Sequence, residues 1–160
     1  MSVVVHATDA EHLHLDLAYA IWKLRQDVFV VEQGCPYPDL DGRDLEPKTR
    51  HVVLEEDDRM LGYARLLDDG DHWRVGRVVL APEGRGRGLA DRLMKTTLLL
   101  CTDDRDIVLD AQSPLAGWYA TFGFVADGPE FLEDGIPHTP MRRGPWQQTG
   151  DPDWFIGARD

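Results

Sequence analysis

The segment from Arg85 to Ala90 carries the residue types and spacing that most directly indicate chemistry. Its two arginines alternate with Gly86 and Gly88, after an apolar run and a turn that contains proline. Glycines let backbone N–H groups approach a ligand closely. The start of a following helix would add unsatisfied N–H donors and a partial positive charge. The pattern therefore predicts a cradle for a phosphate or pyrophosphate group.

The local charge around this segment is positive, opposite in sign to the net charge of the whole chain. Arg85, Arg87, Arg92 and Lys95 gather positive charge here, whereas the 160 residues together have a formal net charge of −12. A flexible loop that opens a solvated basic helix has a similar composition, but the preceding strand and turn favour an anion site. The segment lacks the Gly-Lys-Ser/Thr ending of a P-loop, and it does not follow the first strand of a βαβ unit.

Composition excludes several classes of function. An acidic chain is poorly suited to binding nucleic-acid backbones, so no nucleic-acid partner is expected. Acidity leaves room for a cationic small-molecule acceptor, although it also serves solubility. The sequence has no apolar run of about 20 residues for a membrane span and no signal peptide. With only Cys35 and Cys101, it has no disulfide framework. We expect a cytoplasmic protein without membrane contact.

The elements that must position the Arg/Gly segment follow from hydrophobic spacing. Leu17, Ile21, Leu24 and Val28 recur at helical intervals, which predicts a helix over residues 16–31. Alternating or short apolar runs predict strands over 51–54, 61–67, 73–80, 107–109, 124–126 and 138–142. Two further helices are predicted over 88–101 and 114–122, the second ending at a glycine cap. The order indicates a mixed α/β (α+β) fold with a mainly antiparallel sheet.

Domain organisation is predicted to be simple. Residues 1–143 form one domain, and residues 144–160 form a C-terminal tail of irregular composition. Trp154, Phe155 and Ile156 in that tail would pack on the body or on a partner subunit.

Three blocks of sequence resemble one known family. Arg85-x-x-Gly88-x-Ala90 resembles the acyl-CoA pyrophosphate signature of the GNAT N-acetyltransferase superfamily. Residues 118–124 (WYATFGF) resemble its helix-to-strand motif, in which a tyrosine, here Tyr119, precedes Gly-Phe by four residues. Residues 24–33, 35–37, 39–44 and 133–138 resemble the ElaA-like branch of that superfamily. The resemblance covers roughly residues 15–142.

The resemblance implies a GNAT fold and an acetyl-CoA cosubstrate, with no metal. A primary amine of an acceptor, expected to be a small molecule, would attack the thioester directly in a ternary complex. Backbone at the third long strand would pair with pantetheine, and the Arg/Gly segment would hold the pyrophosphate. The implied cofactor-binding residues are Val78, Val79, Leu80, Arg85, Gly86, Arg87, Gly88, Leu89, Ala90 and Tyr119.

Tyr119 is the implied general acid for the CoA thiolate. An unperturbed tyrosine has a pKa of about 10 and a thiol about 8.5, so full proton transfer is uphill by roughly 2 kcal/mol. A lowered pKa at Tyr119 would remove this difficulty; otherwise the residue acts mainly as a hydrogen-bond donor.

The general base is less well defined by the sequence. Glu32 leads because it lies at the end of the first helix, where GNAT proteins shape the acceptor site. Asp41, Asp110, His138 and a water relay are the other candidates. The residues expected to line the acceptor site are Phe29, Gln33, Arg77, Gln112 and His138.

Three alternatives stay open at this point. One is an acyl-CoA sensor without catalysis. Another is an enzyme like the acyl-homoserine-lactone synthases, since Arg25-x-x-Val28-Phe29-x-x-Glu32 resembles the start of those proteins. The third is acetylation of protein lysines. A homodimer formed through the C-terminal strands is also expected from the family.

Three other patterns carry less weight. Asp39-x-Asp41-Gly42-x-Asp44 differs from an EF-hand because its glycine is misplaced and Arg50 replaces the bidentate Glu, so a turn stabilised by Asp side chains is expected. His12-x-His14 has no further zinc ligands at the usual spacing. Cys35 is expected to be a small buried side chain without a catalytic role.

Overall fold

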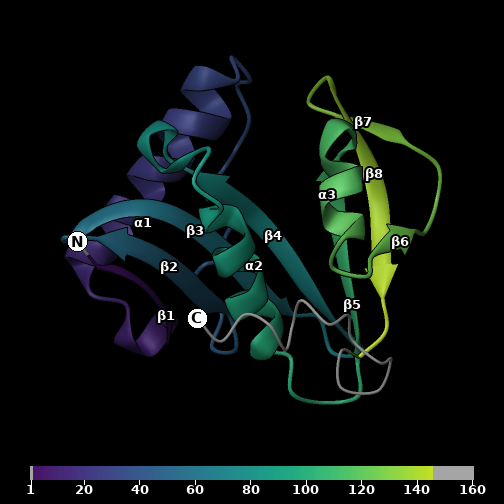
Figure 1. The fold of residues 1–160 in the computed structure, drawn as a ribbon, viewed down its shortest axis with the longest axis horizontal. Coiled ribbons are helices and arrows are strands. Elements are labelled where there is room, and N and C mark those ends of the chain that lie inside the picture. The colour runs from purple at the N-terminus through teal and green to yellow at the C-terminus, as the bar shows by residue number, and fades with distance from the viewer. Residues whose placement is uncertain (1, 146–160) are drawn as a thin grey trace. The chain divides into compact units, whose positions relative to one another are not determined.

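The structure is a computed structural model that describes residues 2–145 (Figure 1). The chain forms two compact units. Among the described residues, unit 1 comprises residues 2–68 and 75–97, and unit 2 comprises residues 69–74 and 98–145. None of the helices between residues 2 and 145 has the length and apolarity needed to cross a bilayer.

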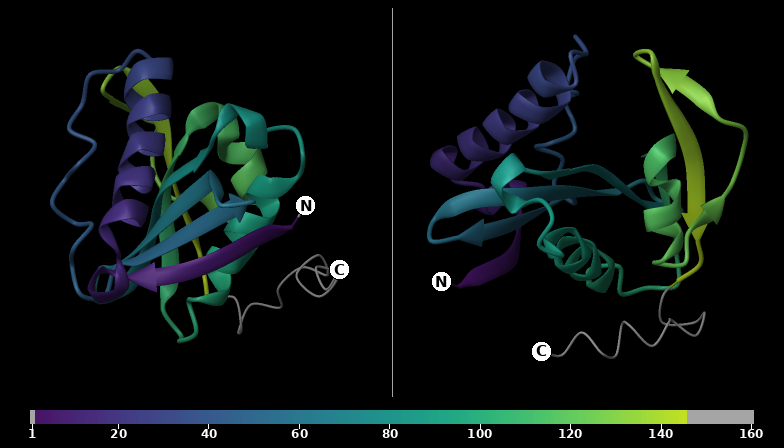
Figure 2. Two further views of the ribbon diagram at one scale, coloured as in Figure 1. Left: turned by 90° about the vertical axis from the view of Figure 1, so that its left-hand side faces the viewer. Right: turned by 45° about the horizontal axis from the view of Figure 1, so that its top comes forward.

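Unit 1 is built on the strands β1 (Val3–Asp9), β2 (Arg50–Glu56), β3 (Arg59–Asp68) and most of β4 (His72–Leu80), in that spatial order. The pairs β1–β2 and β2–β3 are antiparallel. The helices α1 (Leu15–Arg25) and α2 (Leu89–Leu99) cover opposite faces of this sheet (Figure 2). Both faces of β2 are therefore covered, and Val52, Val53 and Leu54 are fully buried.

The first helix has two parts. After α1 the chain continues as a π-helix, η2 (Gln26–Glu32), whose wider turns appear in the backbone bonds from Gln33 N to Val28 O and from Cys35 N to Val30 O. The helix ends at Gly34, which has φ +63°. The predicted helix over 16–31 is confirmed in extent. Its π-helical second half was not predicted, because hydrophobic spacing does not resolve a local widening of the turn.

A hydrophobic core joins α1 to the sheet. Its buried side chains come from the helix, the three strands β2, β3 and β4, and the residue after β4: Ile21, Leu24, Val28, Val53, Tyr63, Val79 and Ala81. The helical members are those that the 3.6-residue spacing selects for one face. This packing fixes η2 against the end of β4.

A buried charge network lies beside this core. Arg25 has no exposed surface; its Nε donates to Asp39 Oδ2 at 2.9 Å and its Nη1 to Asp44 Oδ1 at 2.6 Å. Arg65 of β3 donates to Asp44 Oδ1 at 3.1 Å and to both carboxylate oxygens of Asp41 at 2.7 and 2.8 Å. A buried charge is costly unless it is paired and hydrogen-bonded, and here each charge is.

Neutral groups complete the network. His51 Nε2 donates to the carbonyl oxygen of Asp44 at 2.8 Å, which leaves Nδ1 to accept from the Tyr63 hydroxyl at 2.6 Å. Burial lowers the pKa of His51 and keeps the ring neutral, as this pattern requires. The expected turn stabilised by Asp side chains is present, since Asp41 Oδ1 also accepts from the Arg43 backbone N–H at 3.0 Å.

Unit 2 contains β5 (Asp106–Gln112), β6 (Val125–Ala126), β7 (Phe131–Glu133) and β8 (Ile136–Arg143), with the helix α3 (Ala116–Ala120) alongside β5 and β8 (Figure 1). The first residues of β4 run parallel to β5, and β8 pairs antiparallel with β5, β6 and β7. The turn after α3 passes through Gly123 at φ +90°, the expected glycine cap. The mixed, mainly antiparallel architecture predicted from the sequence is confirmed.

Some short elements were not predicted. These are β1, β7 and the 3₁₀ turns η1 (Ala10–His12), η3 (Pro82–Gly84) and η4 (Ser113–Leu115). Strand β1 lies at the sheet edge and is nowhere fully buried, so it lacks a clear alternation of apolar and polar residues. The predicted packing of Trp154, Phe155 and Ile156 falls outside the described residues.

The network predicts a large stability effect at Asp44. In Asp44→Asn the guanidinium groups of Arg25 and Arg65 lose a shared buried counter-ion, which we expect to lower the free energy of unfolding by about 3 kcal/mol. Urea denaturation measures this loss. Asp127→Asn removes the carboxylate of an exposed pair with Arg142 and should cost less than about 1 kcal/mol. Equal losses in the two variants would contradict the account of the network.

The same carboxylates predict a pH dependence of stability. Burial alone would raise the pKa of both carboxyl groups. Hydrogen bonds and charges from Arg25 and Arg65 outweigh burial and hold the pKa of Asp44 below its usual 3.8. Contacts with Arg65, Arg43 and Arg77 likewise hold the pKa of Asp41 below that value. On acidification the unfolded chain takes up these protons first. The stabilisation is therefore complete well above pH 4 and is lost as the pH falls below about 4. Urea midpoints measured down to about pH 3 should fall more steeply in wild type than in Asp44→Asn.

Candidate functional site

The Arg/Gly segment has the backbone shape that the sequence predicts. One 3₁₀ turn, η3, leads from β4 to two glycines in the left-handed region, Gly86 and Gly88, both at φ +72°, and α2 begins at Leu89. A Cβ at either glycine would meet nothing within 4 Å among the described residues. Glycine is thus required by the dihedral angle and not by packing, and the space beside the loop is open to a ligand.

Arg85 connects three parts of unit 1. Its Nη1 and Nη2 donate to the two carboxylate oxygens of Glu32, each at 2.7 Å, in a bidentate pair. Its Nε and Nη2 also lie 3.3 and 3.2 Å from the carbonyl oxygen of Leu80. The side chain therefore ties the end of η2 to the end of β4 and to the loop.

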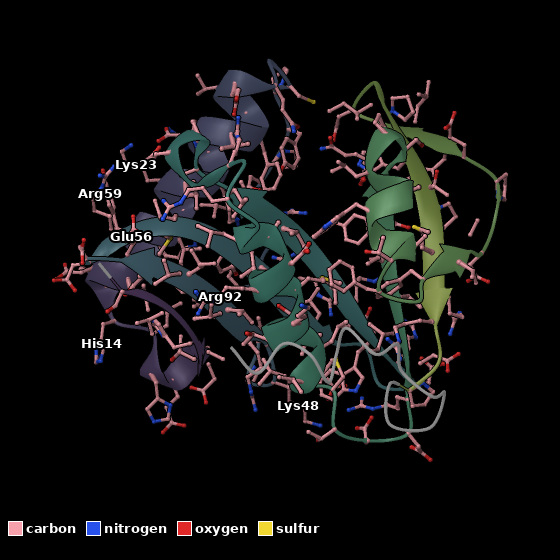
Figure 3. The ribbon with its side chains drawn as sticks, in the orientation of Figure 1. His14, Lys23, Lys48, Glu56, Arg59 and Arg92 are labelled. Carbon is pink, nitrogen blue, oxygen red and sulfur yellow. The ribbon has the colours of Figure 1, made fainter. Side chains whose placement is uncertain are left out.

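Arg87 is held in a similar way. Its Nη1 and Nη2 donate to the carboxylate oxygens of Glu56, at the end of β2, at 3.2 and 2.6 Å. Figure 3 shows Glu56 at this end of the sheet, and Arg92 farther along on α2. Hydrogen bonds from Arg85 and Arg87 lower the pKa of Glu32 and Glu56 respectively, so both carboxylates are ionised at neutral pH. An anion that binds these arginine side chains therefore competes with the carboxylates.

Strand β4 carries an irregularity next to the expected pantetheine residues. Arg77 has φ +52°, a left-handed conformation that costs a residue with a side chain about 1–2 kcal/mol. Its guanidinium is held by the acidic segment: Nη2 donates to Asp39 O at 3.1 Å and to Asp41 Oδ2 at 3.3 Å. Its Nε lies 3.0 Å from Asp39 Oδ1 without hydrogen-bond geometry. The charge network thus reaches the residue that precedes Val78.

Several of the remaining candidates lie in unit 2. Gln112 and His138 are paired residues on β5 and β8, and Gln112 leads through η4 into α3, which carries Tyr119. His138 Nδ1 lies 2.7 Å from Ile136 O, and its ring stacks on Phe131 at 5.7 Å between centroids. Its ring is thus engaged within the β7–β8 hairpin.

Tyr119 is 7% exposed, in an aromatic cluster with Trp118 and Phe124. Burial raises the pKa of its hydroxyl above the usual 10. The proton is thus held more tightly than in free tyrosine, which disfavours complete transfer to a thiolate and favours hydrogen-bond donation.

The other acceptor and base candidates have varied surroundings. Phe29 is partly buried against the hydrophobic core that joins α1 to the sheet, whereas Gln33 is exposed. Asp41 is committed to Arg65 and Arg77, and its lowered pKa makes it a weak base. Asp110 is exposed, with Arg74 Nη1 3.5 Å away.

Comparison with known proteins shows the family. The model of the acetyltransferase (GNAT) domain matches residues 30–144, which include parts of both units. The chain belongs to the GNAT acetyltransferase family. Protein ElaA of Escherichia coli is 41% identical over 143 residues, 84% of this chain and 94% of ElaA. A UPF0039 protein of Mycobacterium tuberculosis is 45% identical over 139 residues, 84% of this chain and 88% of that protein.

Solved GNAT structures agree with this assignment. An acyl-CoA N-acyltransferase from Pseudomonas aeruginosa superposes with a TM-score of 0.85 at 40% identity, covering 89% of this chain and 99% of that one. The ElaA structure gives a TM-score of 0.84 at 37% identity, covering 88% and 99%. The acyl-homoserine-lactone synthase BjaI matches at 0.77 but only 20% identity, which shows a shared fold alone. The chain is thus an N-acetyltransferase of the GNAT family, of the ElaA-like type.

The sequence indicates the Arg/Gly loop but not the residues that its arginines contact. Glu32 was selected as a base, and the structure shows it as the counter-ion of Arg85. Glu56 was not selected at all, because its contact with Arg87 joins positions 31 residues apart. Asp39 and Asp44 belong to the acidic motif for which the sequence predicts a turn stabilised by Asp side chains. Nothing in the sequence indicates which arginines neutralise them.

The ion pairs predict that Glu56 competes with an anion for Arg87. Glu56→Gln removes the competing charge and keeps the shape, so we expect inorganic pyrophosphate to bind about twofold to fivefold more tightly. Calorimetry at low ionic strength measures the change. Glu46→Gln removes the same charge from the pair with Arg43, away from the loop, and serves as the control. Unchanged or weaker binding in Glu56→Gln would show that Glu56 does not compete with the anion for Arg87.

Proposed function

We propose that the chain transfers an acetyl group from acetyl-CoA to a primary amine of a small-molecule acceptor. The observation that carries the proposal is the loop after β4, with two left-handed glycines open to a ligand and a helix of eleven residues starting at Leu89. Its backbone N–H groups and Arg87 suit a pyrophosphate. A phosphate-rich cosubstrate matches this loop better than it matches the acidic remainder of the chain.

The chain's own residues would contribute mainly by positioning. Backbone at Val78, Val79 and Leu80 would pair with pantetheine, and the kink at Arg77 would present neighbouring N–H groups to the developing oxyanion. In the reaction the amine nitrogen bonds to the thioester carbon, the C–S bond breaks, and the CoA thiolate leaves. Two bound substrates held in this way react without a covalent enzyme intermediate.

Proton transfer would involve Tyr119 and Glu32. Tyr119 would stabilise the departing thiolate by hydrogen bonding, as its raised pKa favours. Glu32, with a lowered pKa, would accept the amine proton only weakly, through water, so orienting Arg85 is its better supported role. Phe29, Gln33, Arg77, Gln112 and His138 are the proposed acceptor-site residues.

Cellular location and assembly are part of the same proposal. Cys35 and Cys101 are both buried and are not joined in a disulfide, which supports a reducing cytoplasmic setting. A homodimer formed through the C-terminal strands is proposed from the family resemblance.

The test of the function is release of CoA thiol from acetyl-CoA across a panel of small primary amines and lysine peptides. We expect release that depends on a small amine, with an acetylated amine as product. Acetyl-CoA binding without release on any amine would identify a sensor, and release on peptides alone would identify a protein-lysine acetyltransferase. With S-adenosylmethionine, the molecule bound with isopentyl-CoA in the BjaI synthase structure, added to the panel, an acyl-lactone product would favour the synthase alternative.

Tyr119→Phe tests the proposed donor. We expect the change to lower kcat by about tenfold or more while the Kd of acetyl-CoA stays within about twofold, because the hydroxyl acts on the leaving group. Steady-state kinetics and calorimetry give the two values. Tyr63→Phe removes a hydroxyl that His51 holds in the core, and controls for loss of a buried phenol. Unchanged kcat in Tyr119→Phe would remove the role.

A further inference from the structure

A cavity of about 490 Å³ lies in unit 1 between the first helix and the segment that leads into the loop. We call it the α1 cavity. Its volume falls in the range of sites that bind small molecules. In Figure 3, Lys23 on α1 and Arg59 at the start of β3 mark this side of the unit.

The floor of the α1 cavity is apolar. It is formed by side chains from the helix, from β3 and from the residues after β4: Ala20, Leu24, Val28, Met60, Ala81 and Pro82. Alanine and proline at three of these positions leave the space that longer side chains would fill. Such a floor takes up the hydrocarbon part of a ligand.

The charged lining is predominantly acidic. Lys23, Asp27, Glu32 and Glu83 line the α1 cavity, which gives it three negative charges and one positive charge. Arg85 and Arg59, which pair with Glu32 and Glu83, are not among the described residues that line it. The cavity therefore presents the carboxylates of Glu32 and Glu83 while their cationic partners lie outside its lining, and only Asp27 has its partner, Lys23, within it.

Glu32 and Glu83 are ionised, and all three carboxylates retain acceptor capacity. The pKa of Glu32 is lowered by Arg85, and that of Glu83 by its own backbone N–H and then by Arg59. Asp27 receives one hydrogen bond, from Lys23 Nζ at 2.6 Å. Each carboxylate has about four acceptor positions, so one cationic partner leaves others for a ligand.

We propose that the α1 cavity binds a primary ammonium compound with an apolar body. The ammonium would lie among Asp27, Glu32 and Glu83, with its body on the apolar floor. An anion would meet a net negative lining, and a bare metal ion would leave the floor unused. The inference rests on the proposed function in one respect, that such an amine belongs to the acceptor class of the transferase.

Direct binding in the absence of acyl-CoA tests the site. The probe is 2-phenylethylamine, and its neutral isostere 2-phenylethanol is the comparison. We expect the amine to bind about fivefold more tightly than the alcohol, by calorimetry at low ionic strength. Ala20→Phe, which fills the cavity, should abolish binding of both while thermal unfolding shows that the variant is folded.

Two substitutions on the helix should act in opposite directions. Asp27→Asn should weaken amine binding about twofold to fivefold, and Lys23→Gln should strengthen it by a similar factor, with the alcohol unaffected. Asp16→Asn removes the same charge as Asp27→Asn from the same helix, outside the cavity lining, and should leave binding unchanged.

Several results would overturn the proposal. These are no amine binding up to about 10 mM, equal affinities for amine and alcohol, or equal effects of Asp16→Asn and Asp27→Asn. Because acyl-CoA is absent, the outcome is independent of the transferase assay. If the amine binds but no acetyl group is transferred, the amine site in the α1 cavity stands and the proposed transferase function is wrong. If acetyl transfer occurs but no amine binds in the α1 cavity, the function stands and the amine site is wrong.

Discussion

The neutralisation of buried Arg25 is the interaction on which the rest of unit 1 depends. Its guanidinium lies at the junction of α1 and η2 and must be paired where it is buried. Asp39 and Asp44 supply that pairing, and so fix an otherwise irregular segment between the helix and β2. Arg65 and Arg77 join the same carboxylates from β3 and β4. One network of charges thus fixes the positions of the first helix, the acidic segment, β3 and β4 relative to one another within unit 1.

Charged contacts hold both ends of the β4 segment that would meet pantetheine, and the network of Arg25 supplies those at one end. At one end Arg77, in a left-handed conformation, is held by Asp39 and Asp41. At the other end Arg85 binds both the Leu80 carbonyl and Glu32. The strand between them is therefore held in position before any ligand arrives. Preorganisation of this kind is what a reaction that depends on positioning requires.

The sequence predicted most of the fold and the position of the loop for identifiable reasons. Helical spacing in α1 and the cap at Gly123 are local signals that the structure confirms, and the glycines at 86 and 88 have the left-handed backbone that glycine permits. The π-helical turns of η2 and the pairing of Arg87 with Glu56 depend on tertiary packing, which local spacing does not record. The acidic motif was visible, but its arginine partners lie up to 38 positions away in the chain.

The measurement that tests the central claim most directly is calorimetric titration of acetyl-CoA into wild type and an Arg85→Ala/Arg87→Ala variant. Arg59→Ala, which removes an exposed arginine outside the loop, is the control. Binding by the cradle after β4 predicts a loss of affinity of about tenfold or more in the loop variant and little change in the control. Absence of wild-type binding, or an equal loss in Arg59→Ala, would contradict it.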